Sequence, residues 1–454
     1  MLVIVSDLHL KDGTSGSSIS PDAFQVFAEW LRGLAYRASW RADGVYRPLE
    51  AFDLLLLGDI LDLIRSERWL LKPGGGDEHL RPWDDPQSDA FVAKVVEITE
   101  AVLHHNRAAL AVLRRMAQGE VIRLPAPRRD GLPDPEVLLP VKVRIHYMVG
   151  NHDWLLHLPG GAYDALRTRV IGALGLSNPP SPFPHQAEES DTLMSLLLDH
   201  RVYARHGDVY DAMNYHAALG RDHATVGDAM TIELLTRFPL EVRRQLGTEV
   251  PLRFVEGLKE LSNVRPVLVT PMWVNNLIRD FGGDEAQSQA IKDVWNQAAD
   301  RFLQSDFIRS QDQPLRLDVV DALEGALLFS KSFSFDGLER LARWAYGRVT
   351  KNTAISLADH ALEEHALVAR TVDFVVYGHT HYAETVPLDV YRRGKQTVSQ
   401  VYYNTGTWHP YYELTLRSPQ VMDFVGLQIM GYAAFFRGDE HGGRRAEVWT
   451  GALT

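Results

Sequence analysis

The chain contains no cysteine, so neither disulfide bonds nor thiolate metal ligands are available to it. Any metal ion must be held by His, Asp, Glu or Asn, which suit hard or borderline ions such as Mn, Mg, Fe and Zn. A basic excess is also missing: the net charge of -12 argues against non-specific binding to nucleic acid or anionic membranes. Long apolar runs are absent too. The nearest candidate, Val421–Phe436, contains Asp423 and Gln428, and we expect a core strand or packed helix there rather than a membrane-lying segment.

The remaining composition is that of an ordinary soluble globular protein, with 45% apolar and 23% charged residues. Its 454 residues indicate two or three domains, or one domain with large insertions. The apolar run Leu2–Val5 follows the first residue directly. It is too short for the apolar part of a signal peptide, and no positively charged segment precedes it. We therefore expect a cytoplasmic protein without a transmembrane segment.

Runs of residues that read as strands recur along the chain, and each is followed by Asp, His or Asn. Leu2–Val5, Phe52–Leu57 and Val372–Val376 are apolar, Val141–Val149 alternates, and Arg201–Arg205 is a short strand candidate. The runs and the motifs that follow them are Leu2–Val5 with Ser6-Asp7-Leu8-His9, Phe52–Leu57 with Gly58-Asp59-Ile60-Leu61-Asp62, Val141–Val149 with Gly150-Asn151-His152-Asp153, Arg201–Arg205 with His206-Gly207-Asp208, and Val372–Val376 with Tyr377-Gly378-His379-Thr380-His381. In α/β sheets, ligands bind at the carboxyl ends of the strands. We therefore expect one polar cluster there, made of Asp7, His9, Asp59, Asn151, His206, His379 and His381.

This mixture of carboxylates and imidazoles suits a site for two metal ions. One carboxylate must bridge ions that lie about 3.5–4 Å apart in such sites. Asp59 is the candidate for the bridge, because the preceding Gly58 lets the backbone turn closely.

Between Val209 and Arg370 the pattern changes to helical spacing, apart from a short strand expected at Val267–Thr270. We interpret residues 209–370 as a helical insertion that serves as a cap or a dimer surface, and residues 1–208 and 371–454 as the core. Helices are also expected at Pro21–Arg37, capped by Ser20, and at Ala90–Met116, with a loop at Pro125–Pro135.

The order Asp-x-His, Gly-Asp-x-x-Asp, Gly-Asn-His-Asp, His-Gly and Gly-His-x-His resembles that of the calcineurin-like metallophosphoesterases. The motifs extend from Asp7 to His381, nearly the whole chain, but leave the segment between His206 and Gly378 outside the shared pattern. The resemblance implies an α/β fold, namely a four-layer metallophosphoesterase-type β-sandwich flanked by helices, here with a large helical insertion.

The resemblance also implies a role for each motif residue. One metal ion would be held by Asp7, His9 and His381, the other by Asn151, His206 and His379, and Asp59 would bridge them. His152 would act as the leaving-group acid or as a contact to the phosphate, oriented by Asp62. Manganese is the first choice among Mn, Fe, Zn and Mg. Asp153 and Asp208 are either partners that position the ligands or loop residues that cap the next helix.

The implied activity is hydrolysis of a phosphoester bond. Two divalent ions would neutralise phosphate oxygens and lower the pKa of a shared water, whose hydroxide attacks phosphorus while His152 assists the leaving group. We expect a small phosphorylated substrate, which is a monoester, a diester or a pyrophosphate.

Two branches of the family share features with the chain. Ser-Asp-Leu-His-Leu and His-Gly-Asp resemble the UDP-2,3-diacylglucosamine pyrophosphatase branch, which commonly has Arg in place of His152. Gly-Asn-His-Asp fits the repair nucleases and general phosphodiesterases, but the acidic charge disfavours a nuclease. A non-catalytic scaffold is a further alternative; loss of ligands would mark it, and none is lost. His157, His216 and His223 are expected to have surface or helix roles.

Overall fold

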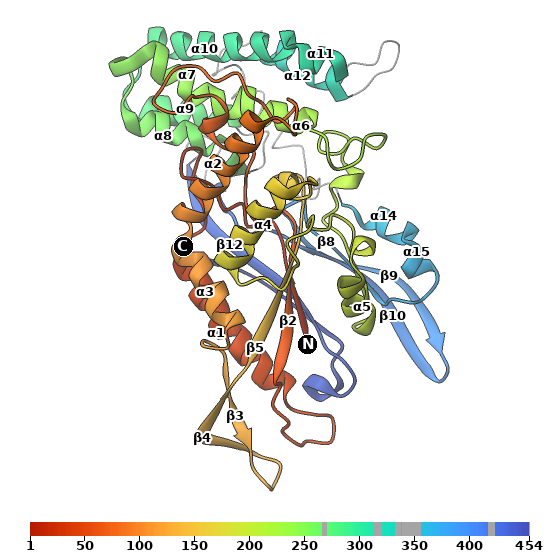
Figure 1. Cartoon of the computed structure of the whole chain (residues 1–454). Coiled ribbons are helices and arrows are strands. Elements are labelled where there is room, and N and C mark those ends of the chain that lie inside the picture. Colours follow the sequence, from red (N-terminus) through yellow and green to blue (C-terminus); the bar gives the residue numbers. More distant parts are fainter. Residues whose placement is uncertain (266–269, 312–318, 332–336, 338–355, 416–422, 454) are drawn as a thin grey trace.

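The computed structural model describes residues 1–265, 270–311, 319–331, 337, 356–415 and 423–453 (Figure 1). The strand expected at Val267–Thr270 lies outside these residues, apart from Thr270, which begins a helix. No helix among the described residues has the length and apolarity needed to cross a membrane.

The larger of two main sheets carries the first motif-bearing strands. Its order is β5 (Lys142–Met148), β2 (Ala51–Leu57), β1 (Leu2–Val5), β12 (Phe424–Phe435), β11 (Pro410–Leu414) and β7 (Val264–Arg265), with β13 (Ala446–Leu453) also paired to β12. β1 and β5 both pair in parallel with β2, so the carboxyl ends of these three strands lie at the same edge.

The second sheet has the order β6 (Val202–Ala204), β8 (Phe374–Tyr377), β10 (Gln396–Thr405) and β9 (Ala383–Arg393). Here β6 and β10 both pair in parallel with β8. The two sheets share one buried apolar core, so they pack face to face. The core includes Leu2, Ile4, Leu55 and Leu57 from the first sheet and Val202, Ala204, Phe374 and Val376 from the second. Every second residue of β1, β2, β6 and β8 faces this core, as the pleat of a strand requires.

Helices cover the outer faces of both sheets. The alternate residues of β1 and β2 pack against α1 (Pro21–Ala38), α2 (Asp89–His105), α3 (Arg107–Ala117) and α4 (Gly161–Leu174). On the far side, Val375 and Tyr377 of β8 pack with α14 (Ala358–Glu363) and α15 (His365–Val368). One further helix, α5 (Asp191–Asp199), contributes Leu193 and Leu197 to the core between the sheets. The predicted α/β class is thereby confirmed.

Two predictions of local structure are wrong. The helix expected at Ala90–Met116 is two helices separated at Asn106, whose side-chain amide donates to Lys11 O at 2.7 Å. The loop expected at Pro125–Pro135 lies in a hairpin of β3 (Arg123–Pro127) and β4 (Pro133–Pro140). Proline is tolerated in such a two-stranded ribbon because each strand has one unpaired edge.

The segment that we predicted as a helical insertion contains most of the remaining helices. Those helices are α6 (Val226–Ala229), a π-helix at Met230–Thr236, α7 (Arg237–Leu246), α8 (Leu252–Lys259), α9 (Thr270–Asp280), α10 (Glu285–Gln304), α11 (Asp306–Gln311) and α12 (Val319–Lys331). They gather at one end of the molecule (Figure 1). Phe238, Phe254 and Trp273 form an apolar core of their own, joined to Leu414 of β11, and β7 pairs with β11. The division of the chain into core and insertion stays a prediction.

Candidate metal centre

The predicted ligands lie on the loops that follow β1, β2, β5, β6 and β8, and their side chains converge. Among the described residues, five of the eight non-glycine residues with positive φ belong to this set: Asp7 (55°), His9 (44°), Asp59 (55°), His379 (68°) and His381 (64°). Such backbone conformations are disfavoured for residues with a Cβ and tend to cluster at functional sites. The loops are therefore held in conformations that local preference alone would not produce.

A first group of potential ligand atoms comes from Asp7, His9, Asp59 and His381, which lie within 4.8 Å of one another. The Nε2 atoms of His9 and His381 are 3.0 Å apart. His381 Nε2 lies 3.4 Å from Asp7 Oδ1, and His9 Nε2 lies 3.6 Å from Asp59 Oδ2. Atoms that each lie about 2.1 Å from a shared ion are about 3.0–3.4 Å apart, so the spacing fits a metal ion.

A second group consists of Asp59, His206 and His379, and Asn151 joins it. Asn151 Oδ1 lies 3.2 Å from His206 Nε2 and 3.0 Å from His379 Nδ1. His206 Nε2 is also 3.4 Å from Asp59 Oδ2, the same oxygen that faces His9 in the first group. One carboxylate oxygen therefore lies between the two groups.

Three of the histidine rings have a hydrogen-bond acceptor next to the ring nitrogen that points away from the two ligand groups. His206 Nδ1 is 3.0 Å from Leu57 O, His9 Nδ1 is 3.1 Å from Asp62 Oδ2, and His379 Nε2 is 3.0 Å from Asp211 Oδ2. Because each acceptor takes one ring N–H, the other ring nitrogen of each histidine points to the centre and presents its lone pair there when the ring is neutral. These are the tautomers that metal binding needs.

Burial lowers the pKa of His9 to about 3, so this ring is neutral as a ligand must be. His206 differs. Burial alone would lower its pKa, but Asp59 and Asp7 raise it well above its ordinary value. An ion that binds at His206 must therefore displace a proton, and ion binding at this position is favoured by rising pH.

His152 lies beside the two groups and is tied to Asp62. Asp62 Oδ1 accepts from His152 Nδ1 at 2.9 Å, while Asp62 Oδ2 accepts from His9 Nδ1. His9, Asp62 and His152 also lie close enough to hold an ion, but these short contacts are those of N–H donors to a carboxylate, and we read them as hydrogen bonds. Burial alone would lower the pKa of His152, but Asp62 and Asp59 raise it above its ordinary value. His152 is therefore well placed to carry a proton.

Asp153 and Asp208 are both buried, and neither belongs to a ligand group. Asp153 accepts from Tyr147 Oη at 2.6 Å, from Ile60 N at 2.8 Å and from Gly150 N at 2.6 Å. It makes no capping bond to the short helix that follows it. Asp153 thus ties together the two loops that carry Asp59 and Asn151, and of the two roles left open for it, positioning is the one that its contacts support.

Asp208 accepts from His185 Nε2 at 2.9 Å and forms an ion pair with Arg221. Its contacts reach into the segment after β6, and it makes no capping bond to its own short helix either. Asp208 therefore anchors the chain that leaves His206.

Four residues near the centre were missed at the level of sequence. Besides Asp211, they are Asn214, whose Oδ1 accepts from Asn151 Nδ2 at 3.3 Å, Arg265, whose Nη2 lies 3.1 Å from His381 Nδ1, and His409, whose ring centroid lies 5.3 Å from that of His9. Three of them come from the predicted insertion, and none stands directly after an apolar strand run. The pattern used to find the ligands could not reveal them.

A scan against protein-family models and a search of curated proteins both found no match for this sequence. The resemblance to calcineurin-like metallophosphoesterases therefore stays a hypothesis that rests on the five motifs.

Proposed function

We propose that this chain is a binuclear, metal-dependent phosphoesterase of the calcineurin-like type. The observation that carries the proposal is the position of Asp59 Oδ2, 3.6 Å from His9 Nε2 in one ligand group and 3.4 Å from His206 Nε2 in the other. A carboxylate shared between two sets of nitrogen and oxygen donors is the arrangement that a two-metal hydrolase requires. The packing of two sheets between two layers of helices supports the metallophosphoesterase-type sandwich.

The two ions would be held by Asp7, His9 and His381 on one side and by Asn151, His206 and His379 on the other, with Asp59 shared. All of these donors are nitrogen or oxygen atoms, which suits Mn first and also Fe, Zn or Mg. Two bound divalent ions would offset the charge of a phosphate group and lower the pKa of a water molecule.

The chain itself supplies the proton that the leaving oxygen needs. Asp62 engages Nδ1 of His152, so the proton to be transferred would leave from Nε2. The backbone N–H of His152 also donates to Asp59 Oδ1 at 2.8 Å, which fixes this histidine relative to the shared carboxylate. General acid catalysis of this kind contributes about 10²–10⁴-fold to a rate.

We propose a small phosphorylated molecule as substrate. The net charge of -12 counts against a nucleic acid, and a non-catalytic scaffold would not need a complete set of ligands. A comparison of bis-p-nitrophenyl phosphate, single-stranded DNA and a UDP-sugar pyrophosphate discriminates among the branches. Clear preference for DNA would overturn the small-molecule assignment.

The first test is Asp59→Asn, which removes charge from both ligand groups at once. We expect hydrolysis of bis-p-nitrophenyl phosphate to be abolished and the metal content of the purified protein to fall, because each ion loses an anionic ligand. Elemental analysis measures the metals. A wild-type protein with fewer than one transition metal per chain, and with no activity on added Mn, would favour the scaffold.

The second test separates proton transfer from metal binding. His152→Ala should lower kcat by about 10²–10⁴-fold while both ions stay bound. His157→Ala is a matched control, since His157 also bonds to a carboxylate, Asp222, but lies outside the ligand groups. If His152→Ala empties a metal site instead, His152 is a ligand and its proposed role is wrong.

A further inference from the structure

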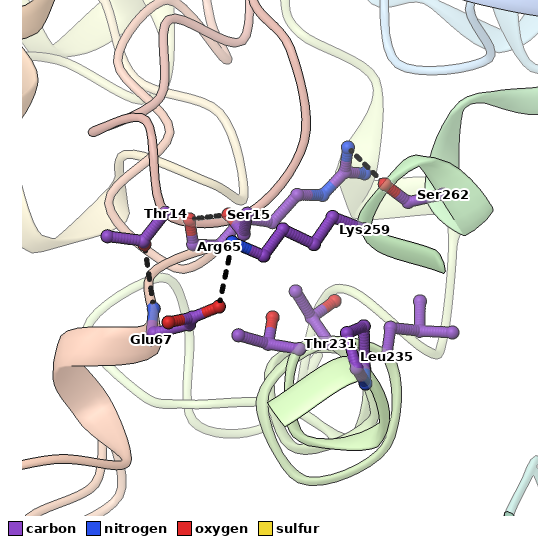
Figure 2. Close-up of a pocket in the computed structure, with 10 residues that line it drawn as sticks. Thr14, Ser15, Arg65, Glu67, Thr231, Leu235, Lys259 and Ser262 are labelled. Atoms are coloured by element: carbon purple, nitrogen blue, oxygen red, sulfur yellow. Dashed lines mark hydrogen bonds and ion pairs between the residues drawn. The ribbon is translucent and has the colours of Figure 1, made fainter. Parts of the chain in front are cut away.

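Two arginines lie next to the proposed centre on the side of His381. Arg65 follows the second motif, and Arg265 belongs to β7 in the predicted insertion. Both bond to the same residue: Arg65 Nη1 donates to Ser262 Oγ at 3.4 Å, and Arg265 Nη1 donates to Ser262 O at 2.8 Å. Figure 2 shows the side chain of Arg65 reaching Ser262. Two guanidinium groups from distant parts of the chain are thus brought together.

Their positive charges are incompletely offset. Arg265 donates to Ser262 O and Val264 O, and among the described residues it forms no ion pair with a carboxylate. Arg65 Nε lies 3.5 Å from Asp62 Oδ2 but makes no hydrogen bond, although it is buried. Asp62 accepts instead from two histidines and from the backbone N–H of Arg65. Buried donors without acceptors are costly, and an anion would satisfy them.

The outer nitrogen of a metal-bound histidine normally donates to an acceptor, but that of His381 faces a donor, Arg265. Arg265 Nη2 lies 3.1 Å from His381 Nδ1, and a guanidinium can only donate. If His381 binds an ion through Nε2, its proton stays on Nδ1, which then cannot accept from Arg265. His381 therefore differs from the three histidines whose outer nitrogens face an acceptor, because its outer nitrogen faces the guanidinium of Arg265.

Contacts between the helical segment and the core fix the position of Arg265. A pocket beside Arg65 is walled by Thr14 and Glu67 of the core loops and by Thr231 and Lys259 of the helical segment (Figure 2). Lys259 Nζ lies 3.4 Å from Glu67 Oε1 across this junction, and β7 pairs with β11. These contacts hold the strand of Arg265 against the core.

We propose that Arg65 and Arg265 bind a second anionic group of the substrate, a phosphate adjacent to the one that is hydrolysed. The inference rests on the proposed function and narrows its substrate class to compounds with neighbouring phosphate groups, such as diphosphates. Arg265 contacts Nδ1 of His381, whereas Nε2 faces the other ligands, so the guanidinium lies on the outer side of the ring from the shared carboxylate. This position of the guanidinium suits a phosphate group adjacent to the one that is hydrolysed. The planar guanidinium can donate two parallel hydrogen bonds to a pair of phosphate oxygens.

The test is calorimetric titration of the Mn-loaded protein with inorganic phosphate and with methylenediphosphonate, a diphosphate analogue that resists hydrolysis. We expect Arg265→Gln to weaken binding of the diphosphonate by about 10–100-fold, which is about 1.4–2.8 kcal/mol, because hydrogen bonds to a charged group are lost. Binding of phosphate should change much less. Arg253→Gln is the matched control. Arg253 belongs to the same segment, is exposed, and donates to Asp280 O, so neither affinity should change.

An equal loss for both ligands would overturn the proposal, because Arg265 would then act on the hydrolysed phosphate. No loss for either ligand would overturn it as well, as would loss of bound metal in Arg265→Gln, which would show that Arg265 only supports His381. If Arg265→Gln does not fold, Arg265→Lys keeps the charge without the fork and should show a smaller loss, again specific to the diphosphonate.

Failure of the proposed function is visible separately, in a wild-type protein that neither retains metal nor hydrolyses bis-p-nitrophenyl phosphate. In that case, Arg265-dependent binding of the diphosphonate to the metal-free protein would support an anion site at the two arginines. Absence of such binding would overturn it.

Discussion

Replacement of Asp62 by Asn hardly changes the side-chain volume, but it replaces one acceptor oxygen with an NH2 donor. Asp62 Oδ1 faces His152 Nδ1 at 2.9 Å and Arg65 N at 3.0 Å. Asp62 Oδ2 faces His9 Nδ1 at 3.1 Å and Arg65 Nε at 3.5 Å. All four neighbours are donors, so the amide nitrogen of Asn meets donors in either orientation. One of the two histidines must lose its acceptor.

The size of the effect depends on which histidine is affected. If the amide nitrogen faces His9, that ring changes tautomer and weakens one metal site, by about 10–100-fold as for other partners of metal-bound histidines. If it faces His152, the proton donor is misplaced and kcat falls by about 10²–10⁴-fold. In either case we expect kcat/KM to fall at least about 10-fold. The amide nitrogen removes one hydrogen bond if it faces His9 and two if it faces His152 and Arg65 N. At about 1.5–3 kcal/mol for each bond to a charged group, the free energy of unfolding should fall by about 1.5–6 kcal/mol.

Steady-state hydrolysis of bis-p-nitrophenyl phosphate across a Mn titration, with metal content and urea denaturation, measures all three quantities. Asp53→Asn is the matched control. Asp53 is a buried carboxylate of β2 that accepts from Arg144 Nε at 2.7 Å and lies 3.0 Å from His146 Nε2, but it belongs to no ligand group. We expect it to lower stability while leaving kcat and metal content unchanged. If Asp62→Asn keeps kcat/KM and Mn affinity within about threefold of wild type, the assigned role of Asp62 is wrong.

Two further predictions concern residues outside the proposed ligand set. Asp211→Ala removes the acceptor 3.0 Å from His379 Nε2 and should weaken one of the two metal sites about 10-fold in a competitive titration, while the other site keeps its affinity; equal weakening of both would contradict this. Burial alone would lower the pKa of His157, but Asp222 and Glu189 raise it to about 9, so its contribution to stability is complete below about pH 6.5 and is lost as the pH rises through 9. Urea denaturation should show this decline in the wild type, and His157→Gln should flatten it over that interval.

The strands that carry the motifs could be predicted from sequence to within a few residues. Leu2–Val5 is β1 as expected, and β2 and β5 begin within one residue of the predicted runs. β1 and β2 are buried on both faces and show as continuous apolar runs, whereas β5 shows as an alternating pattern. Both patterns are local properties of the chain. The hairpin β3–β4 and the break at Asn106 could not be predicted in this way. The prolines of the hairpin favour the prediction of a loop. The break at Asn106 depends on a hydrogen bond from its side chain to Lys11 O, 95 residues away in sequence.

The amino-acid sequence alone specifies which donor side chains are available and that each of them follows a strand. The absence of cysteine also excludes thiolate ligands, and the net charge of -12 argues against an overall basic surface. Tertiary packing places Asp59 Oδ2 between the two ligand groups. It also sets which nitrogen of each histidine ring faces inward, through acceptors such as Leu57 O and Asp211. It also brought Arg265 to His381 from 116 residues away. Such contacts follow from how the helical segment packs on the sheets, and no local pattern encodes that packing.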